Sequence, residues 1–70
     1  MKEFVKPRIS LRIAQGNQIF WRNGDKPHAE LDARVSATQM SSATKEPVAI
    51  YRHSGSEVKL IARYVDGKPA

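Results

Sequence analysis

The residues of this chain that could carry catalytic chemistry are few and widely spaced. The two histidines, His28 and His53, lack the helical spacing and the partnering carboxylate typical of a metal site. Cysteine is absent, which excludes thiolate chemistry and disulfides. No serine lies in a Gly-x-Ser-x-Gly setting, and the four glycines are scattered rather than gathered in a phosphate-binding loop. We therefore expect no enzymatic activity, no cofactor and no metal.

Basic and aromatic side chains offer a different chemistry, that of binding. Twelve Lys and Arg against seven Asp and Glu give a net charge of +5, which favours an anionic partner. Cations that follow phosphates, interleaved with rings that stack bases, are typical of surfaces that bind single-stranded nucleic acid. The same residue types suit the apolar centre and arginine rim of a protein interface. They are also ordinary on a solvated strand face, so the elements that position them must be considered.

Alternation of apolar and polar residues predicts two β-hairpins, one on each side of a middle segment. Residues 8–14 and 18–22 flank a Gly-Asn turn, and residues 48–53 and 58–65 flank a loop that contains glycine.

The middle segment, residues 28–46, fits two patterns. Strict alternation over residues 30–38 is typical of a strand, whereas alanines and Met40 recur at helical spacing. Good helix formers, Pro27 at the start and Pro47 just past the end favour the helix.

The expected fold is therefore α+β, with a four-stranded antiparallel sheet and one helix packed on one face, in the order ββαββ. If the middle segment is a strand, the alternative is an all-β five-stranded small barrel or meander. Seventy residues leave room for one domain, residues 1–70, with flexible ends at about 1–6 and 66–70.

A helix whose buried stripe is mostly alanine requires the sheet to supply the bulky part of the core. We expect the strand residues facing the helix to be Ile9, Leu11, Ile13, Ile19, Trp21, Val48, Ile50, Val58, Leu60, Ala62 and Tyr64. Alternation then assigns the other strand residues to an open face. The candidate binding residues on that face are Arg8, Arg12, Phe20, Arg22, Tyr51, His53, Lys59, Ile61 and Arg63. If the second strand has the opposite parity, Trp21 joins the open face and Phe20 turns inward.

These patterns predict a small, basic, non-enzymatic module that binds nucleic acid through the open face. The alternative is a protein-interaction module or small inhibitor, of the size that bacteria, phages and mobile elements encode, with an acidic protein partner at the same face. A homodimer that buries the face is a further alternative. The charged N-terminal residues do not fit a signal peptide, and no stretch approaches membrane-spanning length. We therefore expect a cytoplasmic location and no membrane partner.

Overall fold

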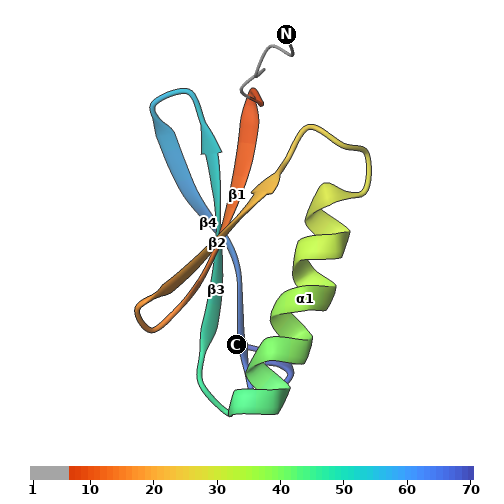
Figure 1. Cartoon of the computed structure of the whole chain (residues 1–70), viewed down its shortest axis with the longest axis vertical. Coiled ribbons are helices and arrows are strands. Elements are labelled where there is room, and N and C mark those ends of the chain that lie inside the picture. Colours follow the sequence, from red (N-terminus) through yellow and green to blue (C-terminus); the bar gives the residue numbers. More distant parts are fainter. Residues whose placement is uncertain (1–6) are drawn as a thin grey trace, which may run out of the picture.

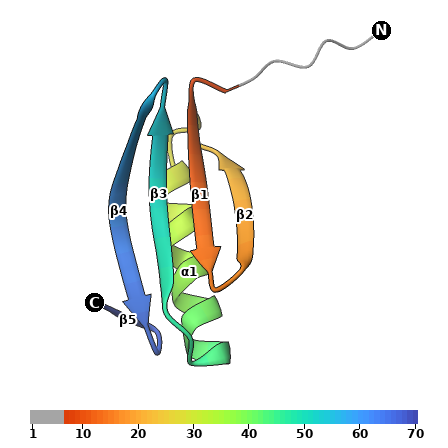
Figure 2. The same ribbon diagram turned by 90° about the vertical axis from the view of Figure 1, so that its left-hand side faces the viewer.

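Five antiparallel strands form one open sheet, and a single helix lies along one of its faces (Figures 1 and 2). The computed structural model describes residues 7–70. The elements are β1 (Ile9–Gln15), β2 (Gln18–Asn23), α1 (Ala29–Thr44), β3 (Val48–Ser54), β4 (Glu57–Val65) and β5 (Lys68–Pro69). The strand order in the sheet is β2-β1-β3-β4-β5. The α+β class, the ββαββ order and the central helix are confirmed, and the barrel alternative is wrong.

The two ends of α1 follow from local chemistry. Glu30 and Asp32 lie in the first turn, where the helix dipole favours acidic side chains. Lys45 adopts the left-handed conformation with φ 64°, and its N–H donates to the carbonyl of Ser41, which is a common way for a helix to end. Pro47, two residues further on, cannot continue the helix.

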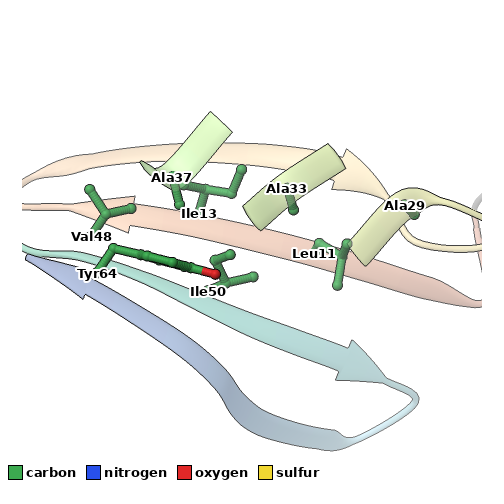
Figure 3. Packing of buried hydrophobic residues seen from close by; sticks show 8 residues of the cluster. All are labelled: Leu11, Ile13, Ala29, Ala33, Ala37, Val48, Ile50 and Tyr64. Atoms are coloured by element: carbon green, nitrogen blue, oxygen red, sulfur yellow. The ribbon is translucent and has the colours of Figure 1, made fainter. Parts of the chain in front are cut away.

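The core lies between small helix residues and larger strand residues (Figure 3). Its buried hydrophobic members are Ala29, Ala33 and Ala37 of α1, together with Leu11, Ile13, Val48, Ile50 and Tyr64 of the sheet. Alanine side chains let the helix approach the sheet closely, so the aliphatic residues fill the space beneath it. This division of the core between helix and sheet is the one expected from the sequence.

The C-terminal segment, residues 66–70, was expected to be flexible and is instead attached to both layers. Asp66 and Gly67 have φ of 52° and 77°, as a two-residue type I′ turn requires, and β5 then pairs with the end of β4. The N–H of Gly67 donates to Ser41 Oγ of α1 at 2.9 Å. The other end expected to be flexible, residues 1–6, lies outside the described residues.

Four residues expected in the core belong to the opposite face of the sheet: Ile19, Trp21, Val58 and Leu60. In β2 the cause is the two-residue turn at Gly16 and Asn17, which fixes the pairing of the hairpin. Phe20 pairs with Ile13 and therefore shares the helix side, while Trp21 pairs with Arg12. The alternative parity for the second strand is thus the correct one.

In β4 the cause is a β-bulge at Ile61. Ile50 pairs with Ala62, but the next residue of β3, Tyr51, pairs with Leu60, which leaves Ile61 as the extra residue. A bulge of this kind shifts the alternation of the strand by one residue. The part of β4 before the bulge therefore has the opposite parity to the part that follows it.

Candidate functional site

The face of the sheet that α1 does not cover, called the outer face below, is turned toward the viewer in Figure 2. The strand pairings arrange its side chains in rows across β2, β1, β3 and β4. The central row is Trp21, Arg12, Tyr51 and Leu60, flanked by Ile19, Ala14, Ala49 and Arg63 on one side and by Asn23, Ser10, His53 and Val58 on the other.

Large apolar side chains gather on this face and stay in contact with water. The exposed fractions are 51% for Ile19, 56% for Trp21, 54% for Val58 and 47% for Leu60, with the half-buried Tyr51 between them. We call these five residues the apolar patch. Exposed apolar side chains gathered on one face mark a contact surface, and here they include the chain's single tryptophan.

Two aromatic contacts hold the middle of the patch in place. The guanidinium carbon of Arg12 lies 4.5 Å from the centre of the Tyr51 ring, within the range of a cation–π interaction. The rings of Trp21 and His53 meet edge to face, with centroids 4.9 Å apart and an interplanar angle of 64°. These contacts orient the side chains in advance and reduce the entropy lost when a partner binds.

The outer face is also cationic. Arg12 and Arg63 belong to it, and no Asp or Glu does in the strands that the structure describes. Asp25 lies in the connection before α1, while Glu30 and Asp32 lie in its first turn. The acidic side chains of the described residues thus lie away from the outer face, whereas further basic side chains, those of Arg22, Arg52 and Lys59, have the parity of the helix side.

The structure brings five of the nine predicted binding residues together. Arg12, Tyr51, His53 and Arg63 share the outer face. Arg8, which precedes β1, lines a pocket together with His53 at the edge of that face.

The other four predicted binding residues do not lie on the open face, so the prediction is wrong for them. Phe20 and Arg22 lie on the helix side, where Arg22 Nη2 donates to Ser36 Oγ of α1 at 3.2 Å. Lys59 pairs with Arg52, which also has the parity of the helix side. Ile61, the bulge residue, packs against the core. The hairpin parity and the bulge are the physical reasons for these corrections.

The main prediction placed the apolar members of the outer face other than Tyr51 in the core, and only the alternative parity of the second strand put Trp21 on the open face. For Ile19 and Trp21 a signal was present, because a two-residue loop at Gly16 and Asn17 implies that Phe20 pairs with Ile13. For Val58 and Leu60 the apolar run Leu60-Ile61-Ala62 does not show which residue is the extra one, so the bulge could not be located from the sequence.

A second surface feature lies on the helix side, between the edge strand β2 and α1. Phe20 and Met40 line this groove together with polar residues such as Gln18 and Gln39. Phe20 is exposed because α1 packs mainly over β3 and β4 and makes little contact with the edge strand β2.

Comparison with known proteins gives one informative match. Over 58 residues the chain is 31% identical to a protein named biopolymer transport protein exbD2, from Xanthomonas campestris pv. campestris. The matched segment is 81% of this chain and 43% of that protein, so the chain spans less than half the length of its relative. No protein-family model matches the chain, and no solved structure matches it.

This match corrects the main functional expectation. A similarity to a biopolymer transport protein contradicts nucleic-acid binding as the role of the open face. The same similarity contradicts the expected cytoplasmic location. Within residues 7–70, no helix combines the length and the apolar character needed to cross a bilayer.

Proposed function

We propose that this chain is a non-enzymatic protein-binding module of a biopolymer transport system, and that it binds a partner protein through the outer face. The observation that carries this proposal is the apolar patch: five apolar or aromatic residues with no covering layer in the described part of the chain. The similarity to a transport protein supports the context of the interaction.

The composition of the outer face is that of an interface centre. Trp, Tyr and Arg are the residue types most often found to dominate binding energy, and Trp21, Tyr51 and Arg12 occupy one row of the sheet. Aliphatic side chains surround them, and Arg63 lies at the margin. An apolar centre with a charged rim is the usual arrangement of a protein interface.

The exposure of the apolar patch does not stabilise the isolated fold. A domain of seventy residues has a small core, and burying Trp21 within it would add to stability. The described structure instead keeps its buried core small and places the largest hydrophobic side chain in water. A partner protein that covers the outer face would remove this surface from water and recover that free energy.

A photo-crosslinking amino acid placed at one of two exposed leucines tests the proposal in cells that naturally make the chain. Leu60 lies on the outer face, and Leu31, on α1, is at least as exposed, at 60% against 47%. We expect a discrete protein adduct, identified by mass spectrometry as a transport component, from position 60 and not from position 31.

The variant Trp21→Ser should remove that adduct while the chain stays folded, as judged by circular dichroism. Adducts of equal yield from both positions, or none from position 60, would show that the outer face is not the binding surface. An adduct that disappears after nuclease treatment would show that the outer face binds nucleic acid, and the proposal would be wrong.

A further inference from the structure

A pocket opens at the edge of the outer face beside the tryptophan of the apolar patch. Its lining residues are Pro7, Arg8, Ser10, Trp21, His53 and Gly55. Trp21 belongs to both features, so a segment lying on the patch would reach the pocket without leaving the surface. We call this feature the Trp21 pocket.

The polar side chains around the Trp21 pocket all carry hydrogen-bond donors, and one of them, the Arg8 guanidinium, can only donate. Arg8 contributes a guanidinium, Ser10 a hydroxyl and His53 an imidazole. His53 Nε2 is buried and has no hydrogen-bond partner among the described residues, and the same is true of Arg12 Nε in the adjacent row. Polar groups removed from water without a partner cost free energy. The Arg12 guanidinium can only donate, and the His53 imidazole donates from Nε2 when that nitrogen carries the proton, so an acceptor satisfies both.

Among residues 7–70, no carboxylate is found to supply that acceptor. Asp25 lies near Arg8, but its two oxygens accept from the backbone N–H groups of Arg8 and Ile9, each at 2.9 Å. The ion pairs found among residues 7–70 join Arg34 to Glu30 and Lys45 to Asp66, both away from this pocket.

We propose that the Trp21 pocket binds a carboxylate side chain of the partner protein, flanked by apolar residues that pack on the patch. This inference rests on the proposed function and specifies the chemistry of the partner. A carboxylate fits because it offers only acceptors and pairs with a guanidinium through charge-assisted hydrogen bonds. Its charge is opposite to that of the outer face.

Charge also argues against a second copy of this chain as the occupant. A two-fold dimer through the outer face would place identical patches against each other. Arg12 and Arg63 of one copy would then face the same cationic surface of the other, with no carboxylate on either face among the described strands. An acidic segment of a different protein avoids this repulsion.

A selection of displayed random peptides against the full, immobilised chain tests the proposal. We expect the enriched peptides to carry an Asp or Glu next to aliphatic or aromatic residues. The best peptide is then synthesised with its acidic residue and with the matching amide, Asn or Gln, and both dissociation constants are measured by fluorescence anisotropy. The acidic form should bind about tenfold more tightly, which corresponds to one charge-assisted contact.

Matched variants of the chain locate the acid preference. The double variant Arg8→Gln, His53→Gln should lose the tenfold difference between acid and amide peptides. Arg34→Gln, which removes a positive charge on α1, should keep it. The ratio of the two affinities is the readout because a general loss of folding would weaken both peptides alike, and thermal denaturation of each variant checks this directly.

The outcomes separate this inference from the proposed function. If enriched peptides lack acidic residues but lose binding on Leu60→Asp, the outer face binds protein and the carboxylate pocket is wrong. If the acid preference survives in the double variant, the carboxylate binds elsewhere and the pocket is also wrong. If no peptide is enriched, or Leu60→Asp leaves binding unchanged, both proposals fail.

Discussion

Ile50 and Leu60 show at the residue scale how side-chain direction decides the role of two similar residues. Ile50 is fully buried beneath α1, whereas Leu60 lies on the outer face and is about half exposed. We expect Ile50→Ala to lower the free energy of unfolding by about 2–5 kcal/mol, because it leaves a cavity in the core. Leu60→Ala should cost no more than about 1 kcal/mol. Urea denaturation measures both, and equal losses would contradict the assignment of Leu60 to the outer face.

Ser41 is a buried polar residue whose hydroxyl links α1 to the C-terminal turn. Its hydroxyl accepts from the N–H of Gly67 at 2.9 Å and donates to the carbonyl of Thr38 at 3.2 Å. Ser41→Ala should therefore lower the free energy of unfolding by about 1–3 kcal/mol, since the Gly67 N–H is left without an acceptor.

Ser42→Ala is the matched control for this change, because Ser42 is exposed on the same helix and gains the same helix propensity. Chemical denaturation of both variants should show a loss only for Ser41→Ala. A loss of similar size in both would mean that the bond to Gly67 contributes nothing to stability.

At the scale of the elements, the contact between α1 and the sheet depends on the small size of the helix residues. Ala37 is fully buried against the strands, while Ala43 is an exposed alanine six residues later. Ala37→Leu should destabilise the fold by about 1–3 kcal/mol, because the larger side chain forces the helix away from the sheet. Ala43→Leu should leave the melting temperature nearly unchanged. If both variants melt alike, the close approach of the layers is not limited by Ala37.

The elements themselves differ in how far local signals specify them. The ends of α1 follow from its acidic first turn and from Pro47, and the first hairpin follows from the turn at Gly16. The parity of β4 does not, because Leu60, Ile61 and Ala62 are all apolar and the run fits either face until the bulge is known. Because of the bulge, β4 can pair with β3 next to the turn that joins them and still direct Tyr64 into the core.

At the scale of the whole molecule, the fluorescence of the single tryptophan reports the charge of the outer face. Trp21 lies on the cationic face, more than half exposed to solvent. Iodide should therefore quench its fluorescence more strongly than caesium, since the surface attracts anions and repels cations. The ratio of the two quenching constants measures this preference at low ionic strength.

The double variant Arg12→Gln, Arg63→Gln should lower that ratio toward the value of a free, uncharged tryptophan derivative, and added salt should do the same by screening. Arg34→Gln, on the helix, serves as the charge-matched control. If the unaltered chain already gives the ratio of the free derivative, the basic side chains do not attract anions to the outer face.

From the sequence alone, the α+β class, the element order and the alanine-lined helix could be predicted, because periodicity, turn residues and prolines act over short distances. The tertiary structure decided which residues of β2 and β4 contact the core. Strand parity depends on pairing register and on one bulge, and a shift of one residue exchanges the two faces of a strand. For this reason Trp21 and Leu60, expected in the core, form the surface on which the functional proposal depends.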